Sequence, residues 1–234
     1  MKIKKILLVS FLFNFILACG LGGLLHRLGG IKYVIFKATV GDSATGVSAG
    51  RTDFFRLVDD AEGEIIFLGD SLTEQVEWSE VYHDLKIKNR GIGGNRATQI
   101  LKRLDEVVAS KPQKIFLMAG INDLVSDPKE KVVKTLKQIA TNIRESSPET
   151  NIYVQSILPV NNSIRDSKRS NADIQFINNQ LEAFCQGDSH FIWVDLYASF
   201  VDNQNRLNPD CTYDGLHLNG AGCMKWCDIV SAYL

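Results

Sequence analysis

The sequence predicts an α/β protein, a three-layer sandwich in which helices cover both faces of a parallel sheet. Short apolar runs that suit buried strands alternate along the chain with longer segments of helical periodicity. Strands separated by helices of this length pair in parallel through right-handed crossovers. The length of 234 residues, with 45% hydrophobic and 23% charged residues, fits one substantial globular domain behind an N-terminal leader.

Five strands and four helices are predicted from these patterns. The strands are Glu64–Leu68, Lys86–Arg90, Lys114–Met118, Ile152–Ser156 and Phe191–Val194. The helices cover about residues 97–109, 128–146, 168–186 and 220–233. The second helix has the best-marked start, because Asp127 is placed to cap it, Pro128 suits its first turn and Glu130 follows three residues after the cap.

Residues 1–30 are predicted to form a signal or membrane anchor. Three lysines near the start are followed by residues 6–25 without a charge, which is long enough to cross a bilayer as a helix and also resembles a long secretory signal. An uncleaved anchor is ranked above lipidation at Cys19 or secretion, and each places the body in the cell envelope or beyond. Small residues then favour a linker at 31–52, which includes Ser43, before a folded domain at 53–234.

Charge and cysteine content exclude several function classes. The formal net charge is −1 and the body of the chain has no dense basic stripe, which argues against a nucleic acid partner. There is no CxxC pair, and the four histidines lack metal-ligand spacing, so no structural zinc is expected. For the cysteines after the leader, a disulfide that involves Cys211 and buried free thiols both stay open. These cysteines are Cys185, Cys211, Cys223 and Cys227.

Polar or glycine-rich sequence follows the first three predicted strands and precedes the last helix. The four stretches are Gly69-Asp70-Ser71-Leu72, Asn89-Arg90-Gly91-Ile92-Gly93-Gly94-Asn95, Gly120-Ile121-Asn122-Asp123 and Asp214-Gly215-Leu216-His217. Each alone has a simpler explanation, such as a helix cap at Ser71, turn glycines or an Asx turn at Asn122. Because loops after parallel strands meet at one edge of a sheet, their joint order favours a shared site.

The chemistry that these residues allow is acyl transfer. Ser71 is the predicted nucleophile, His217 is the base that takes its proton, and Asp214 orients the imidazole. The backbone N–H groups of Ser71 and Gly94, with the side-chain amide of Asn122, are the predicted oxyanion hole.

Neighbouring charged residues are given structural roles. Asp70 and Asp123 are expected to tie the loops together through side-chain to backbone hydrogen bonds. Arg90 and Arg96 flank the glycine loop and are expected to be solvated, with contact to an acidic substrate as the minority interpretation.

In these four stretches the sequence resembles the GDSL, or SGNH, hydrolase family. The four residues that name the family fall on Ser71, Gly94, Asn122 and His217, and its aspartate falls on Asp214. The resemblance runs from about residue 54 to the C-terminus, and the GIGG, GIND and DGLHL stretches are most similar to the branch of platelet-activating-factor acetylhydrolase-like and carbohydrate acetylesterase-like proteins. It implies a flavodoxin-like, five-stranded sandwich and ester hydrolysis without a metal or other cofactor.

The predicted function is a serine esterase that hydrolyses small acyl esters through an acyl-enzyme on Ser71. The connections look short and no apolar lid is evident, and a shallow site favours acetyl over fatty acyl groups. With an envelope location, O-acetylated sugars are the expected substrates. A lysophospholipase or thioesterase is the first alternative. A non-catalytic envelope binding module is the alternative from another class, and the intact Ser71, Asp214 and His217 argue against it.

Overall fold

The computed structural model describes residues 19–20, 22–24, 26–27, 30–32, 35, 46–58 and 62–234. From Gly50 to Leu234 the chain forms one compact unit, and this unit is the subject below. Most of the predicted anchor at 1–30, and the part of the predicted linker that contains Ser43, lie outside the described residues. No helix within the described ranges combines the length and the apolar character that crossing a membrane requires. Residues 46–52 of the predicted linker belong to a helix, and the proposed domain boundaries stay predictions.

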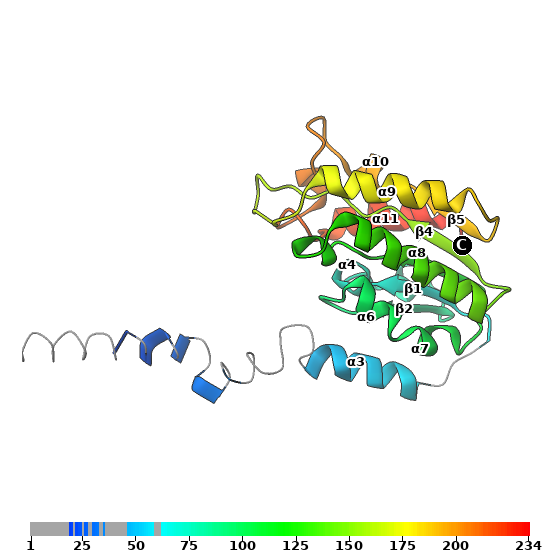
Figure 1. Cartoon of the computed structure of the whole chain (residues 1–234), viewed down its shortest axis with the longest axis horizontal. Coiled ribbons are helices and arrows are strands. Elements are labelled where there is room, and N and C mark those ends of the chain that lie inside the picture. The colour runs from blue at the N-terminus through cyan, green and yellow to red at the C-terminus, as the bar shows by residue number, and fades with distance from the viewer. Residues whose placement is uncertain are drawn as a thin grey trace, which may run out of the picture. The chain divides into compact units, whose positions relative to one another are not determined.

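The centre of the unit is a five-stranded parallel sheet with the strand order β2-β1-β3-β4-β5 (Figure 1). The strands are β1 (Ile65–Gly69), β2 (Ile87–Gly91), β3 (Lys114–Met118), β4 (Asn151–Gln155) and β5 (Phe191–Val194). Gly69 at the end of β1 is in register with Gly91 of β2 and Met118 of β3, so these strands end level with one another. The predicted α/β class is confirmed, and each predicted strand lies within one residue of an observed one.

Helices follow each strand, as the crossover connections require. The α-helices are α3 (Gly46–Leu57), α4 (Ser71–Glu74), α5 (Trp78–Val81), α6 (Ala97–Leu101), α7 (Leu104–Val108), α8 (Lys129–Ser146), α9 (Asn171–Cys185), α10 (Tyr197–Phe200) and α11 (Gly220–Ser231), and the 3-10 helices are η1 (Asp123–Val125) and η2 (Pro209–Cys211). The long helices α8 and α9 pack side by side along one face of the sheet (Figure 1).

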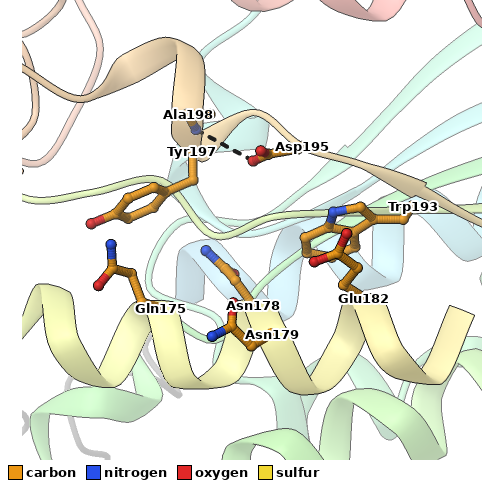
Figure 2. Close-up of a pocket in the computed structure, with 8 residues that line it drawn as sticks. All are labelled: Gln175, Asn178, Asn179, Glu182, Trp193, Asp195, Tyr197 and Ala198. Atoms are coloured by element: carbon orange, nitrogen blue, oxygen red, sulfur yellow. Dashed lines mark hydrogen bonds between the residues drawn. The ribbon is translucent and has the colours of Figure 1, made fainter.

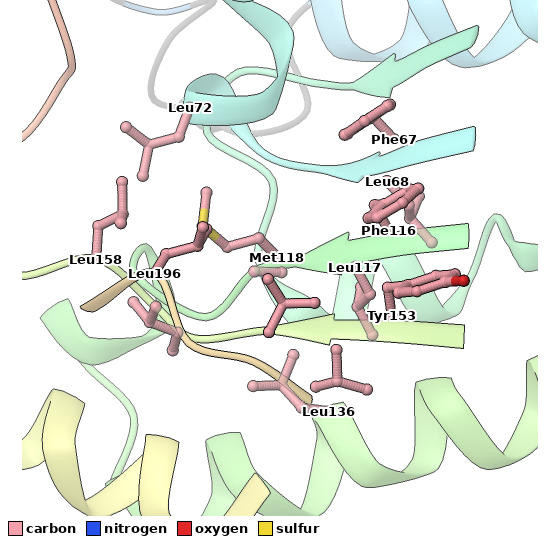
Figure 3. Close-up of a cluster of buried hydrophobic side chains, with 14 of the residues drawn as sticks. Phe67, Leu68, Leu72, Phe116, Leu117, Met118, Leu136, Tyr153, Leu158 and Leu196 are labelled. Carbon is pink, nitrogen blue, oxygen red and sulfur yellow. The ribbon is translucent and has the colours of Figure 1, made fainter. Parts of the chain in front are cut away.

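Aromatic side chains fill the core on the other face. The rings of Phe67, Phe116 and Tyr153 follow one another across β1, β3 and β4 (Figure 3), with centroids 4.7 and 4.5 Å apart. Trp78 of α5 stacks on Phe67 at 3.7 Å, and Trp226 of α11 meets Trp78 edge-on. Because side chains alternate along a strand, the neighbours of these aromatic residues point to the α8 face. Each such buried side chain stabilises the sandwich by about 1.5–3 kcal/mol.

One predicted helix is not continuous in the structure. The stretch predicted as a helix at 97–109 forms two short helices, α6 and α7, with a break at Arg103, whose φ of −117° lies outside the helical range. The buried Arg103 guanidinium donates hydrogen bonds to the carbonyls of Gly69 and Arg90 and pairs with Glu106 at 2.8 Å. Periodicity alone does not reveal a charge that reaches back to the sheet.

Two predictions about surface charges are also wrong. Pro128, not Asp127, occupies the cap position of α8, and the Asp127 carboxylate instead pairs with Arg96 at 3.1 Å and Lys131 at 3.0 Å. Arg90 is 5% exposed rather than solvated. Its guanidinium lies 4.6 Å from the centroid of the Phe55 ring, so an α3 side chain covers it. Arg96 is partly exposed, and its guanidinium forms the ion pair with Asp127.

The described cysteines are free thiols, so the free-thiol alternative holds and a Cys211 disulfide does not form. Cys185, Cys211 and Cys227 are buried, and Cys223 is half-buried. Burial raises the pKa of the Cys185 and Cys227 thiols to about 11, which keeps both protonated at neutral pH.

Candidate active site

The first predicted site residue, Ser71, opens α4 directly after β1. The turn between them is too tight for any side chain at Gly69, where a Cβ atom would lie 2.1 Å from Thr73 Oγ1 and 2.4 Å from the Met118 carbonyl oxygen. Asp70 is the N-cap of α4, and its Oδ1 accepts a hydrogen bond from the Leu72 N–H at 3.0 Å. The serine is therefore presented at the carboxyl edge of the sheet, on a turn that the glycine permits and the aspartate holds.

Ser71, His217 and Asp214 form a continuous chain of hydrogen bonds. Ser71 Oγ lies 3.1 Å from His217 Nε2, although the two residues are 146 positions apart. His217 Nδ1 lies 2.9 Å from Asp214 Oδ2. With Nδ1 protonated, the imidazole presents its Nε2 lone pair to the serine hydroxyl, which is the arrangement of a nucleophile, a base and an orienting acid.

The loop that carries the histidine is shaped by Asp214 itself. Its Oδ1 accepts hydrogen bonds from the backbone N–H groups of Leu216 at 3.0 Å and His217 at 2.7 Å. Gly215 has a φ of +82°, and a Cβ there would lie 2.4 Å from the Asn161 carbonyl oxygen, so glycine is required. One carboxylate thus fixes the turn with one oxygen and the imidazole with the other.

The charge state of Asp214 suits this role. Partial burial acts to raise its pKa, but hydrogen bonds from the His217 side chain and from the His217 and Leu216 backbone outweigh burial and hold the pKa below its usual value. Arg165 adds a cation, with its guanidinium 2.9 Å from Asp214 Oδ2. The carboxylate is therefore ionised at neutral pH and can stabilise a positive charge on the imidazole.

The three predicted oxyanion donors differ in how the chain holds them. Within the described residues, the backbone N–H groups of Ser71 and Gly94 donate to no other protein group. Asn122 Nδ2 donates one hydrogen bond to the Asn95 carbonyl at 3.1 Å, which leaves its second N–H available. At Gly94 a Cβ atom would meet nothing within 4 Å, so the backbone there faces open space.

Glycine is found at three positions of the 89–95 loop for different structural reasons. Only Gly94 has a positive φ, at +75°. Gly91 and Gly93 are small because the loop packs on α4, where Cβ atoms would lie 2.3 Å from Glu74 N and 2.7 Å from Glu74 Oε2. The Gly93 N–H also donates to Glu74 Oε2 at 2.9 Å, and Arg51 of α3 pairs with Oε1 of the same carboxylate at 3.0 Å. The glycine loop is therefore tied to the helix that begins with Ser71.

Asp70 and Asp123 have the structural roles expected of them. Both carboxylate oxygens of Asp123 accept a hydrogen bond from the Ala97 N–H, at 3.2 and 2.9 Å, which joins η1 to the start of α6. Both side chains are 1% exposed. Burial raises the pKa of Asp70 to about 7 and also raises that of Asp123. Neither carboxyl group hydrogen-bonds to Ser71 or His217 in the part of the chain that the structure describes.

Sequence reasoning missed two arginines of the 161–170 loop, one beside each end of the site. Arg169 donates from Nε to the Ile121 carbonyl at 2.6 Å and from a terminal nitrogen to Asn122 Oδ1 at 3.2 Å, so it orients the Asn122 amide. Arg165 contacts Asp214, as described above. The only sequence signal was a basic cluster, SIRDSKR, which has no fixed spacing from Asn122 or Asp214.

Residues 67–224 match the model of the GDSL-like Lipase/Acylhydrolase family. The human platelet-activating factor acetylhydrolase IB subunit alpha1 is 27% identical over 184 residues, which cover 75% of this chain and 77% of that protein.

Solved structures agree on the fold. A Streptococcus pneumoniae structure named after platelet activating factor aligns with a TM-score of 0.75 and 26% identity, covering 87% of this chain and 98% of that one. The acetylxylan esterase Axe2 from Geobacillus stearothermophilus aligns with a TM-score of 0.58 at 18% identity, covering 74% and 94% of the two chains, and supports the fold alone. The family match covers more than half of the sequence and contains the complete Ser71–His217–Asp214 chain of hydrogen bonds. The protein therefore belongs to the GDSL-like lipase/acylhydrolase family and is an ester hydrolase.

Proposed function

We propose that this hydrolase removes small acyl groups, and acetyl groups in particular, from carbohydrate esters through an acyl-enzyme on Ser71. The observation that carries the proposal is the unbroken path from Ser71 Oγ through His217 to Asp214, next to backbone N–H groups that donate to no other group in the described chain. A hydrolase that uses a metal-bound water would not need such a path.

In the first half of the reaction, His217 Nε2 takes the Ser71 Oγ proton while Oγ attacks the ester carbonyl carbon. The negative oxygen that forms receives hydrogen bonds from the Ser71 and Gly94 N–H groups and from Asn122 Nδ2. The C–O bond to the alcohol then breaks, and His217 returns the proton to the departing alkoxide oxygen. In the second half, a water loses its proton to His217 and attacks the acyl carbon. The bond between that carbon and Ser71 Oγ then breaks, His217 returns the proton to Oγ, and the carboxylic acid leaves.

Two features support a small acyl group. The segments that border the nucleophile are short, with four residues in α4 and three in η1, so they contain no long helical hairpin to cover an acyl chain. The name of the human acetylhydrolase, which is 27% identical to this chain in sequence, specifies an acetyl group. Each buried methylene adds about 0.8 kcal/mol of binding only where an apolar wall receives it.

An aromatic ring beside the base supports a carbohydrate leaving group. Tyr213 stacks on the His217 imidazole with ring centroids 6.0 Å apart and an interplanar angle of 11°. Tyr213 is 60% exposed, so a substrate can reach it beside the base that protonates the departing alcohol. A sugar ring can pack its C–H face on such a ring and hydrogen-bond to the hydroxyl.

A lysophospholipase or thioesterase is the second candidate. Val125 in η1 and Ile164 in the 161–170 loop are 54% and 45% exposed, and they adjoin the segments that carry Asn122 and Gly215. Exposed apolar side chains at these positions would suit a longer acyl chain.

The test is kcat/KM for p-nitrophenyl esters of acetate, butyrate, octanoate and palmitate, followed by acetate release from acetylated xylan and acetylated chitin oligomers. We expect kcat/KM to fall steadily with chain length and acetate to be released from at least one sugar substrate. A rise from acetyl to octanoyl would reject the acetylesterase proposal and favour the second candidate.

We also propose that the domain is exported and held in the cell envelope by residues 1–30. The support is the basic start and the uncharged residues 6–25. Full-length protein should sediment with membranes and be cut by protease added to intact spheroplasts. Fatty acid labelling that Cys19→Ser abolishes would identify lipidation in place of a transmembrane anchor, and full recovery in the cytosol would reject export.

A further inference from the structure

A cavity is lined by residues outside the catalytic centre. It has a volume of about 300 Å³, and α9, the end of β5 and the start of α10 line it (Figure 2). None of its lining residues is Ser71, Gly94, Asn122, Asp214 or His217. Its volume lies at the small end of the range for ligand pockets, about 300–1,000 Å³, so it suits a small ligand or one unit of a larger one.

Part of the polar lining is fixed by the chain itself. Tyr197 Oη and Gln175 Nε2 both donate to Asn205 Oδ1, at 2.9 and 3.1 Å. Asp195 Oδ1 accepts hydrogen bonds from Ser156 Oγ and the Ala198 N–H, both at 3.3 Å. These bonds hold the walls in place without a ligand, so less conformational entropy is lost when a ligand binds.

Other polar groups of the lining have no protein partner. Among the described residues, neither the Asn179 amide nor the Glu182 carboxylate takes part in a hydrogen bond or ion pair, and both side chains line the cavity. Asp195 Oδ2 likewise has no partner in the described chain. The cavity therefore offers two carboxylates as acceptors and one amide as both donor and acceptor.

Aromatic surface lies at both ends of the cavity in the view of Figure 2, with Tyr197 at one end and Trp193 at the other. Tyr197 is 8% exposed, so its ring is part of a packed wall, whereas Trp193 is only partly buried. The lining thus combines flat apolar surface with hydrogen-bonding groups of both kinds.

This composition selects among ligand classes. The lining contains no lysine, arginine or histidine, and Glu182 and Asp195 would repel an anion. Asn179 and Glu182 are exposed, so an apolar ligand would displace water from them and offer no hydrogen bond in return, which is unfavourable. A neutral ring with several hydroxyl groups can donate to the carboxylates, exchange hydrogen bonds with the amide and pack its C–H face on the indole.

We propose that this cavity is a binding site for a neutral saccharide unit, separate from the catalytic centre. It would hold one part of a carbohydrate chain while an ester elsewhere on that chain reaches Ser71. Only this role in catalysis rests on the proposed function, because saccharide binding can be measured with Ser71→Ala, which cannot form the acyl-enzyme.

Tryptophan fluorescence of the full-length chain provides a direct test. Of the three tryptophans in the sequence, Trp78 and Trp226 are 1% and 0% exposed, so a ligand in the cavity would report through Trp193. Titration of Ser71→Ala with xylotetraose and with chitotetraose should give a saturable change for at least one of them. Trp193→Phe should abolish that change, and calorimetry on the parent protein should give the same Kd as fluorescence.

Variants of α9 locate the site. Asn179→Ala and Glu182→Ala should each weaken saccharide binding by about five- to tenfold, as expected for the loss of one hydrogen bond to a ligand. Gln180→Ala is the matched control, because Gln180 is exposed on the same helix but does not line the cavity, and its Kd should equal that of the parent.

The outcomes separate this proposal from the proposed function. Saccharide binding without acetate release from any acetylated sugar would support the cavity and reject the carbohydrate esterase. Acetate release without a fluorescence or calorimetric signal from either tetrasaccharide would reject the cavity and leave the esterase. A signal with tetramethylammonium and with neither sugar would also overturn the saccharide proposal, because it would identify a cation site.

Discussion

The catalytic centre and the α9 cavity use similar polar side chains in opposite ways. At the catalytic centre His217 is bonded to Ser71 and Asp214, and Asn122 is held by Asn95 and Arg169. In the cavity, Asn179 and Glu182 have no partner within the described residues. Groups that stabilise a transition state work best when they are already oriented, whereas groups that only bind a ligand can exchange water for it. The protein therefore fixes the orientation of the catalytic side chains, whereas the two cavity side chains are left to bind water or a ligand.

The largest effect should come from breaking the hydrogen-bonded chain at its first atom. Ser71→Ala removes the nucleophile, so kcat for p-nitrophenyl acetate should fall by about 10⁴- to 10⁶-fold. The melting temperature should hardly change, because His217 is the one hydrogen-bond partner of this side chain among the residues that the structure describes. Steady-state kinetics measures the loss, and a variant that hydrolyses the ester as fast as the parent would show that another residue is the nucleophile.

Asp70 should have the next largest effect, on stability rather than on activity. Its pKa is raised to about 7 by burial, so between the ordinary value of 3.8 and 7 the folded state binds more protons than the unfolded state. Stability contributed by this group therefore falls as pH rises through that window. Asp70→Asn keeps the acceptor for the Leu72 N–H but carries no charge, so relative to the parent it should gain about 3 kcal/mol between pH 4 and pH 8.

Urea unfolding of both proteins at pH 4, 6 and 8 measures this gain. Asp214 has a lowered pKa and loses its favourable charge only as pH falls, so it affects the parent and the variant alike. A constant difference in unfolding free energy across the three pH values would mean that Asp70 is ionised in the folded protein throughout.

Asn122 tests the oxyanion hole. Removing one such donor typically costs a factor of about 10²–10³ in kcat, with little change in KM. Asn122→Ala should show this loss, whereas Asn122→Asp should be at least as impaired because its carboxylate would repel the negative oxygen. If Asn122→Ala changed only KM, the amide would bind the substrate without acting on the transition state.

The two arginines of the 161–170 loop should have smaller and unequal effects. Arg169→Met removes the bond that orients Asn122, so kcat should fall by about tenfold while KM is nearly constant. Arg165→Gln is the matched change at the other end, where the side chain is 56% exposed, and it should cost less than about fivefold. Equal losses in the two variants would contradict a specific positioning role for Arg169.

The sequence predicted the strands and the order of Ser71, Gly94, Asn122, Asp214 and His217 because both depend on local patterns. Apolar runs and tight glycine turns mark where strands end, and parallel strands bring those ends together. Arg103 and Arg169 were not predicted because their contacts join residues 34 and 47 positions apart and follow no period. Arg90 was placed on the surface for the same reason, since it lies in β2 and the Phe55 ring that covers it belongs to α3.

The most direct test of the account is covalent labelling of the full-length protein with a serine-directed fluorophosphonate, followed by peptide mass spectrometry. We expect one label per chain, on the peptide that contains Ser71, with loss of esterase activity in proportion to labelling. His217→Ala should react far more slowly, because no base then activates the hydroxyl. Complete inactivation with the label on any other serine, or full labelling of Ser71 without loss of activity, would contradict the assignment of the nucleophile.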